Sequence, residues 1–515
     1  MDTTFAVLPP APAYNPVKQG IARANELGEK SIATTLGYFA TMPASTGIIA
    51  NPVLYHAPVD CNGTEITLDI RSYTIRGVIP EAEIVRGNAG PMDVIFAGLF
   101  SGAGEQIETA TAGKDKLAAL IDQKYFESLG IREGKNFQRG PLLEQIAAFV
   151  KQYPGLGPEV AIQHFATLEK ARLSREEHQD HGVHDDRDQV GLLLEMIATH
   201  MRNVAVGGVS VYLNYLLMNN SQSSDTELTN AAGEFIAAEV SQGRNAFELS
   251  YSLILGRHAN DHERGILERM GTIQIHHGSA GSSMVARYMA TLHTLSVSDF
   301  FVASQMALDG ARHFGAIHDM SDFVQELEAL PSEQRAARIR EKMLGGGLPT
   351  FGHPEISAAG RGNRVEQDPR PAIYIDPVFK AIDAGQLTVS QRQQDRLAIA
   401  RLIYLTAFVN GVLKPDRENE PPLRLTANTD FGAWCVQEAL GIEEPDRTLL
   451  TYIFRGFGWM MDAREQLQQK MIRPVIAPDP QIVPKPNDDQ TIPSVVGRVH
   501  RRLTGDNPFS TQTND

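Results

Sequence analysis

Alternating apolar and polar residues near the N-terminus predict a β-strand. In "TEITLDIRSYTIR", residues 64–76, Ile66, Leu68 and Ile70 are separated by polar side chains, and this period of two is typical of a half-buried strand. The preceding "CNGTE" contains an Asn-Gly turn signal. Little else in the chain has this pattern, so we expect only a small β element.

Helical spacing of apolar residues dominates from about residue 92 onward. "PLLEQIAAFVKQY" and "SDFFVASQMALDGARHFGA" are two examples. In "DRTLLTYIFRGFGWMMDAREQLQQKM", apolar residues recur every three to four positions from Leu449 to Met461. No repeat of fixed period is present, which argues against a solenoid. The pattern predicts a large, mainly α protein with a small N-terminal strand element.

Composition is that of an ordinary globular protein. The chain has 515 residues, of which 42% are hydrophobic and 21% charged, enough to bury a large core. Its formal net charge of −15 argues against nucleic-acid binding, which needs a basic face. A local basic pocket for a small anion remains compatible with this charge.

The cysteine content and the apolar runs bear on location. Cys61 and Cys435 are the only cysteines, which is no disulfide framework and fits a reducing compartment. The first residues, "MDTTFAVLPPAPAYNP", lack the pattern of a signal peptide. "VGGVSVYLNYLLM" is too short to span a membrane and is expected as a buried helix. We expect a cytoplasmic protein without membrane or nucleic-acid partners.

Two histidine-rich segments suggest metal binding but do not fit it. "HQDHGVHDDRD", residues 178–188, has histidines three residues apart, a spacing that matches neither a zinc motif nor HExxH. "HANDH", residues 258–262, is likewise interpreted as polar surface or interdomain contact. No metal site is predicted.

Several further segments combine histidine or arginine with glycine. "IHHGSAGSS" leads into an apolar helix, whose N-terminus favours anions. "DGARHFGA" and "FGHP", followed by "DPR", place His313, His353 and Arg370 beside glycines or prolines. "NTDFGAW" alone suggests Asp430 as a helix N-cap. "FRGFGW" puts Arg455 in a helix that should be buried, where an arginine needs an anionic partner.

The order of these segments, ending in "MIRP", resembles the citrate synthase family. The resemblance extends from about residue 64 to 475 and is strongest in the last 200 residues or so. "YTIRGVIPEAEIV" is also similar to an early family segment. The collinear order is more specific than any single motif.

The resemblance implies a fold and an assembly. Family members are mostly helical homodimers with a large and a small domain, which here implies residues 1–313 and 442–515 for the large domain and 314–441 for the small one. They condense an acyl-CoA with a 2-oxo acid, usually acetyl-CoA with oxaloacetate. They need no metal or other cofactor, since the coenzyme A thioester is a substrate.

The resemblance also implies roles for single residues. His313 would stabilise the enol of the acyl-CoA, His353 would hold and protonate the 2-oxo carbonyl, and Asp430 would remove the α-proton. His277 would contact oxaloacetate, with His276 as the alternative. The arginines implied as carboxylate ligands are Arg370, Arg455 and, from the partner subunit, Arg473.

This set of residues suits the chemistry. A thioester α-carbon is a poor acid, so its proton is removed by a carboxylate while a donor stabilises the thioester oxygen. Oxaloacetate is a dianion, and guanidinium groups bind carboxylates in bidentate geometry. A cleft that closes would exclude water from the reaction.

The sequence departs from the family pattern between His353 and Arg370. This segment is longer than usual, and the basic residue that contacts CoA phosphate has no aligned counterpart; Arg361 and Arg364 are the candidates. "HHGSAGSS" is somewhat closer to relatives that cleave citryl-CoA. Four alternatives therefore stay open: a 2-methylcitrate synthase, a longer-acyl citrate synthase, a citryl-CoA lyase, and a non-catalytic paralogue that binds a carboxylate or acyl-CoA.

Overall fold

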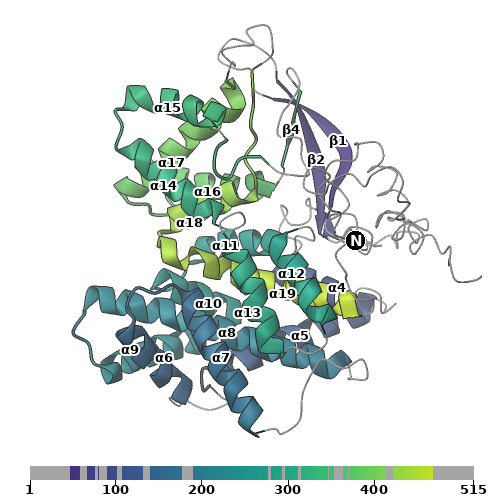
Figure 1. Ribbon diagram of the computed structural model, residues 1–515, viewed down its shortest axis with the longest axis vertical. Coiled ribbons are helices and arrows are strands. Elements are labelled where there is room, and N and C mark those ends of the chain that lie inside the picture. The colour runs from purple at the N-terminus through teal and green to yellow at the C-terminus, as the bar shows by residue number, and fades with distance from the viewer. Residues whose placement is uncertain are drawn as a thin grey trace, which may run out of the picture. The chain divides into compact units, whose positions relative to one another are not determined.

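The structure is a computed structural model, and most of the residues that it describes lie in helices (Figure 1). It describes residues 47–57, 66–75, 79–80, 90–100, 107–131, 140–176, 189–275, 280–292, 296–310, 315–345, 347–352, 364–368, 370–412 and 422–467. All of these lie in one compact unit, residues 45–467. The predicted fold class, mainly α with a small N-terminal β element, is confirmed.

The helices follow one another along most of the described residues. In chain order they are α4 (Pro91–Phe100), α5 (Ile107–Ser128), α6 (Pro141–Gln152), α7 (Pro158–Glu176), α8 (Gln189–Asn219), α9 (Asp225–Ser241), α10 (Ala246–Leu255), α11 (Asp261–Gln274), α12 (Gly281–Thr291), α13 (Val297–Leu308), α14 (Ala316–Glu328), α15 (Ser332–Gly345), α16 (Arg370–Asp383), α17 (Gln391–Tyr404), the π-helical η1 (Leu405–Asn410), α18 (Thr429–Leu440), the 3-10 helix η2 (Glu444–Asp446) and α19 (Arg447–Leu467).

The strand predicted at residues 64–76 is β2 (Ile66–Ile75). It pairs antiparallel with β1 (Gly47–Ala57) and with the short β3 (Ile79–Pro80). A fourth strand, β4 (Arg364–Gln367), joins β2 in parallel, with Arg364 opposite Thr67. The segment that leads into Arg370 is therefore held by a sheet built from the N-terminal part of the chain.

Local sequence explains where several helices begin. α9, α10 and α11 each start with a capping box, in which the side chains of Ser224, Asn245 and Asn260 exchange hydrogen bonds with the glutamate three residues later. α10 ends at Gly256, whose φ of 67° suits glycine. These signals set the helix boundaries before any tertiary packing.

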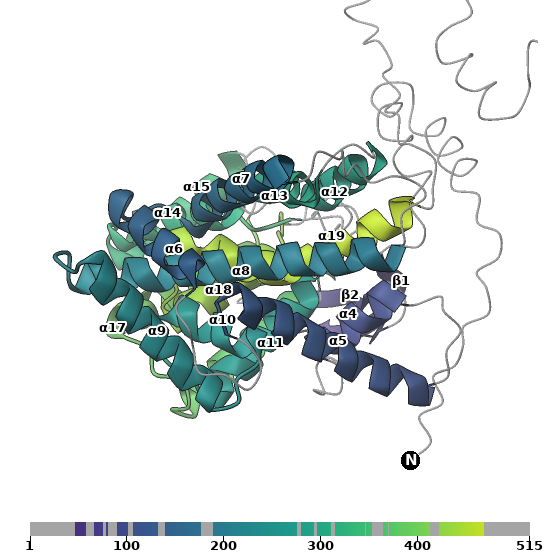
Figure 2. The same ribbon diagram turned by 90° about the horizontal axis from the view of Figure 1, so that it is seen from below.

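Helix α19 is buried on all sides. Its side chains from Thr448 to Ala463 are buried, as expected of a helix at the centre of a large core. It packs against α8, α11 and α12 (Figure 2). Glycines allow this closeness: a Cβ at Gly271 of α11 would lie 2.3 Å from Phe454, and one at Gly207 of α8 would lie 2.6 Å from Leu449.

Helices α14 to α18 form a second group of neighbours (Figure 1). α16 packs along α18, and both also contact α11. The predicted division of the chain into two domains, at residues 313 and 441, stays a prediction. The group matters for the site because α16 and α18 carry Arg370 and Asp430 at their N-terminal ends.

The predicted buried helix at "VGGVSVYLNYLLM" is the second half of α8. It is buried from Val206 to Leu213, whereas Tyr215 and Met218 in its last turn are exposed, so the prediction of burial is wrong for these two residues. Among the described helices, none is both long and apolar enough to cross a membrane.

Candidate active site

Asp430 lies in the first turn of α18. The N-cap of this helix is Asn428, whose Oδ1 accepts hydrogen bonds from the amide nitrogens of Asp430 at 2.9 Å and Phe431 at 3.4 Å. The local interpretation of Asp430 as the cap is therefore wrong, because the asparagine two residues earlier already satisfies the free amides. The Asp430 carboxylate is thus left for another role.

Two arginines and one aspartate influence the charge of Asp430. Burial raises the pKa of its carboxyl to about 6, Arg370 and Arg455 act to lower this pKa, and Asp368 acts to raise it. Three residues that the sequence resemblance singled out, Asp430, Arg370 and Arg455, are thus brought within electrostatic reach of one another from α18, α16 and α19. A carboxyl with a pKa near 6 is suited to accept a proton at neutral pH.

Arg370 forms a buried ion pair with Asp368. The Arg370 Nε donates to both carboxylate oxygens of Asp368, at 2.9 and 3.1 Å, and Nη2 donates to Oδ2 at 2.7 Å. The Arg370 amide also donates to Oδ1 at 3.0 Å. Both side chains are at most 4% exposed. Asp368 therefore orients the guanidinium of Arg370 and accepts a hydrogen bond from the first amide of α16.

Arg455 is tied to the end of α11. Its Nε donates to the carbonyl oxygen of Gln274 at 2.7 Å, and Thr451 Oγ donates to the side-chain oxygen of Gln274 at 2.9 Å. Gln274 ends α11 directly before the segment that contains His276 and His277. The contact links α19 to the point where that histidine pair begins.

The residues before His353 are held against the start of α18. The Gly352 amide donates to the carbonyl oxygen of Thr426 at 2.8 Å. Asn428 donates from its amide to the Thr350 carbonyl at 3.0 Å and from its side chain to the Gly352 carbonyl at 3.1 Å. Thr350 has a φ of 62°, a strained value for a β-branched residue of the kind found at functional sites. Two motifs far apart in sequence therefore meet here.

The other candidate residues lie largely beyond what the structure describes. His276, His277, His313, His353, Arg361 and Arg473 fall outside the described residues, as does the segment 178–188. Arg364 is described only by its backbone, as the first residue of β4. The roles assigned to all of these residues stay predictions.

The "HANDH" segment has a structural contact. His258 Nδ1 forms a hydrogen bond with the buried carboxylate of Glu239, and its ring stacks on Phe235 with 5.1 Å between centroids. Ser252 donates to the same carboxylate. Among the described residues, no group of three or more histidine, cysteine or acidic side chains could hold a metal ion.

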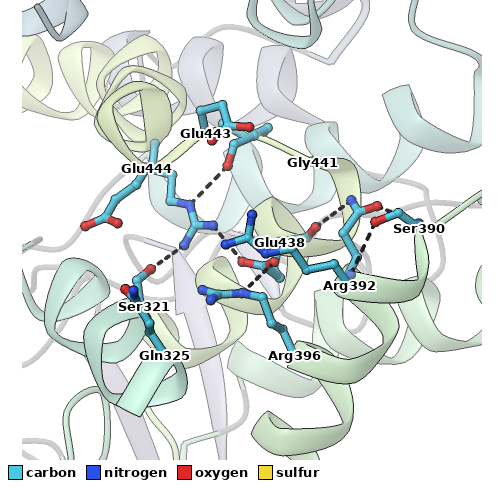
Figure 3. Close-up of a pocket in the computed structure, with 12 residues that line it drawn as sticks. Ser321, Gln325, Ser390, Arg392, Arg396, Glu438, Gly441, Glu443 and Glu444 are labelled. Atoms are coloured by element: carbon cyan, nitrogen blue, oxygen red, sulfur yellow. Dashed lines mark hydrogen bonds and ion pairs between the residues drawn. The ribbon is translucent and has the colours of Figure 1, made fainter. Parts of the chain in front are cut away.

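A cavity of about 310 Å³ lies at the C-terminal end of α18, the opposite end from Asp430 (Figure 3). Its wall carries Arg392, Arg396 and Arg447 together with three glutamates. Because these charges balance, the cavity has no excess positive charge for an anionic substrate.

Buried ion pairs at this cavity fix α18 in place (Figure 3). Glu438 accepts from Arg396 Nε at 2.9 Å and from Arg447 Nη2 at 2.8 Å. Both guanidinium groups lie about 6 Å from the ring of Trp434, and Arg447 also donates to Ser321 at 2.7 Å. This end of α18 is therefore a structural anchor, and the candidate active site lies at the other end.

Three residues that the sequence did not single out support the site: Gln274, Tyr374 and Thr429. Gln274 binds Arg455, and the hydroxyl of Tyr374 bonds to Thr429, the neighbour of Asp430. In the sequence, Tyr374 is one apolar position of a helix, and nothing there identifies its partner. Only the capping asparagine, two residues before Asp430, gave a local signal that could have been used.

Comparisons with known proteins identify the family and the fold. The sequence model of the citrate synthase C-terminal domain matches residues 158–475. Among solved structures, that of citrate synthase from the archaeon Thermoplasma acidophilum, in a ternary complex with carboxymethyl coenzyme A and oxaloacetate, superposes with a TM-score of 0.56 and 16% identity. The match covers 91% of this chain and 98% of that one.

Citrate synthase from Pyrobaculum aerophilum is a second structural match. Its TM-score is 0.52 at 15% identity, over 82% of this chain and 89% of that one. At these identities the two structures show a shared fold. No curated protein matches this chain in sequence.

Proposed function

The chain belongs to the citrate synthase family, and from this premise we propose that it condenses an acyl-CoA with oxaloacetate to give citrate, or a homologue of citrate, and free CoA. Acetyl-CoA is the first candidate for the acyl donor. The observation that carries the proposal is the electrostatic coupling of Asp430 with Arg370 and Arg455. A base for a thioester α-proton therefore lies near two groups that bind carboxylates.

In the proposed mechanism, Asp430 removes the α-proton of the acyl-CoA. His313 donates to the thioester oxygen, so that the enol forms without a free enolate. Arg370, Arg455 and Arg473 bind the carboxylates of oxaloacetate, with His277 or His276 beside them. His353 donates to the ketone oxygen as the enol carbon attacks, which neutralises the developing alkoxide. Hydrolysis of the resulting citryl-CoA releases CoA.

The ion pair between Arg370 and Asp368 limits how Arg370 can bind a substrate carboxylate. Asp368 occupies the edge of the guanidinium that carries Nε and Nη2, which fixes the plane of the group before substrate arrives. A preorganised guanidinium loses less freedom on binding than a mobile one. The role of Arg370 as a carboxylate ligand therefore requires either the Nη1 side of the group or a shift of Asp368.

The proposed reaction needs no metal or added cofactor. It is an acid–base reaction in which the thioester supplies the driving force, so neither a Lewis acid nor a redox group is required. Activity that persists unchanged after dialysis against a chelator would support this. Activity that is lost and then restored by one metal ion would contradict it.

Arg361 and Arg364 are proposed as ligands of the CoA phosphates. The strand β4 begins at Arg364 and pairs with β2, so residues 364–367 at the end of this segment join the N-terminal sheet. Replacing both arginines with alanine should raise KM for acyl-CoA and leave KM for oxaloacetate unchanged. An unchanged KM for acyl-CoA would remove this assignment.

We also propose a homodimer in which Arg473 of one subunit completes the site of the other. Mixing Arg473→Ala subunits with Asp430→Asn subunits provides the test, because each variant alone should be inactive. Activity recovered in the mixed dimer would support a shared site, and no recovery after verified subunit exchange would contradict it.

Release of free thiol tests the proposed reaction itself. Purified protein is assayed with acetyl-CoA, propionyl-CoA and longer acyl-CoAs, each with and without oxaloacetate, and kcat/KM is compared across the series. Thiol release that depends on oxaloacetate supports a synthase, and the preferred acyl chain separates citrate from 2-methylcitrate synthesis. Release of acetyl-CoA from citryl-CoA, without the forward reaction, would instead indicate a lyase.

A further inference from the structure

We propose that Tyr374 is a positioning residue for the reaction: its buried hydroxyl fixes the first turn of α18 and thereby sets Asp430 against Arg370. The inference rests on the proposed function of Asp430 as the base. It assigns to Tyr374 a role in placing the base, without contact with substrate.

The hydroxyl of Tyr374 bonds directly to the residue before Asp430. It donates to the carbonyl oxygen of Thr429 at 2.5 Å and lies 2.6 Å from Thr429 Oγ1. Tyr374 is fully buried, and burial raises the pKa of its hydroxyl well above the usual range. The hydroxyl therefore keeps its proton at neutral pH and remains a hydrogen-bond donor.

The ring of Tyr374 also packs against Gly432, two residues after Asp430. A Cβ at Gly432 would lie 2.2 Å from Cε2 of Tyr374, so the ring occupies the space that any other residue at this position would need. Contacts at Thr429 and Gly432 thus bracket Asp430 within the first turn of α18. This turn cannot shift relative to α16 without breaking one of them.

Tyr374 also lies one helical turn after Arg370 on α16. One rigid helix therefore carries both the guanidinium that acts on Asp430 and the hydroxyl that holds the turn in which Asp430 lies. The separation of the base and the carboxylate ligand is consequently set by α16 as a unit. Because an error of about 1 Å in a reacting group can cost roughly 100-fold in rate, this contact bears on catalysis.

The test is Tyr374→Phe, which removes the hydroxyl and keeps the ring against Gly432. We expect kcat to fall roughly 10- to 100-fold, while the dissociation constant of oxaloacetate, measured by calorimetry, changes little because the arginines remain. The deuterium isotope effect on kcat with methyl-deuterated acetyl-CoA should increase, since removal of the proton becomes slower. A merely structural role would lower the fraction of active protein without changing the isotope effect.

Tyr125→Phe is the matched control. Tyr125 lies in α5, away from Asp430, and is equally buried. Its hydroxyl accepts a hydrogen bond from Ser250 Oγ at 3.0 Å. The control variant should lose similar stability without a change in kcat or in the isotope effect. If Tyr374→Phe does not fold, Thr429→Val removes one of the two contacts and should show a smaller change in the same direction.

The outcomes separate the two proposals. If the wild type is active and Tyr374→Phe leaves kcat and the isotope effect unaltered, the positioning role alone is overturned. The same result in Thr429→Val overturns it where that variant replaces Tyr374→Phe. A folded wild type without turnover for any acyl-CoA would instead overturn the proposed function, and this inference with it.

Discussion

At the scale of single residues, the charge of Asp430 is set by opposing effects. Burial raises the pKa of its carboxyl to about 6 against the pull of two arginines. Ionised Asp430 is therefore less stable in the folded protein than in the unfolded chain, so this group lowers stability as the pH rises from about 4 through 6. Such a cost is common where a residue is kept for function.

The raised pKa of Asp430 also predicts how activity depends on pH. The proposed base must be ionised to accept a proton, so kcat/KM should fall below a pH of about 6 with a slope of one proton. The measurement is kcat/KM for acyl-CoA at saturating oxaloacetate between pH 5 and 9. An acid limb near pH 4 would mean that the carboxyl is solvated and that this account of its environment is wrong.

Asp368 gives a prediction about stability. Asp368→Asn leaves the buried Arg370 without its carboxylate, and breaking a buried pair in this way typically costs about 3–5 kcal/mol. The free energy of unfolding in urea provides the measurement. Asp225→Asn, in a largely exposed pair with Lys151 at 3.1 Å, is the control and should cost less than about 1 kcal/mol. Equal effects in both variants would contradict the buried pair.

For single residues, the sequence predicted which residues lie in the candidate site better than it predicted the contacts that hold them there. Asp430, Arg370 and Arg455 were singled out by the order of motifs, and the structure brings them together. Tyr374 was missed because its partner, Thr429, is distant in sequence and a tyrosine in an apolar helix is usually core. Asn428 was missed as the cap because two adjacent polar residues competed for that role.

At the scale of elements, the position of Arg455 depends on how closely α19 is packed. Gly456 faces His200 of α8, and a Cβ there would lie 2.1 Å from the imidazole Cε1. His200 is itself fixed by a hydrogen bond of 2.9 Å to the Ile453 carbonyl. The imidazole therefore cannot move aside without losing a buried hydrogen bond.

Gly456→Ala should for this reason destabilise the protein by about 2 kcal/mol or more, because the added methyl group overpacks the core. It should also weaken oxaloacetate binding, because it displaces Arg455. Gly265→Ala in α11 is the control, because nothing lies within 4 Å of its Cβ position; it should stabilise the helix by about 0.5–1 kcal/mol. Thermal unfolding and calorimetry measure both effects. A neutral Gly456→Ala would contradict the packing described for α19.

Periodicity predicted α19 and the strand β2, and a short apolar run predicted the second half of α8. Periodicity did not predict β4, because four residues, "RVEQ", within a Gly-rich segment are too few to show a period. It also could not show that glycines of α8 and α11 face α19, since a glycine in a helix carries no sign of its neighbour. The elements were therefore predictable, and their close approaches were not.

At the scale of the whole molecule, buried acids affect stability over a broad pH range. Burial, together with the charge of Glu159 of α7, raises the pKa of Asp309, after α13, and of Asp446, before α19, to about 7 each. Neither carboxylate oxygen of Asp309 has a hydrogen-bond partner among the described residues. Glu159 of α7 thus acts on acids of two segments distant in sequence, and both acids bind a proton more readily than in the unfolded chain.

The protein should consequently be more stable at pH 5 than at pH 8. Between about pH 4 and 7 the folded state binds more protons than the unfolded chain, so stability falls as the pH rises through 7. Urea midpoints at the two pH values test this. The double variant Asp309→Asn, Asp446→Asn should lose most of the difference, whereas Asp115→Asn at an exposed position should keep it. A wild type that is more stable at pH 8 would contradict the prediction.

Asp430 is proposed as the base of a condensation on oxaloacetate, and Asp430→Asn is the most direct test of this role. The variant keeps the shape of the side chain and both arginines, so oxaloacetate should bind in calorimetry with an affinity close to that of the wild type. Release of thiol from acyl-CoA should fall on the order of 10²–10⁴-fold, the usual contribution of a general base. Turnover at the wild-type rate would contradict the account, as would a loss of oxaloacetate binding that alone explains the loss of activity.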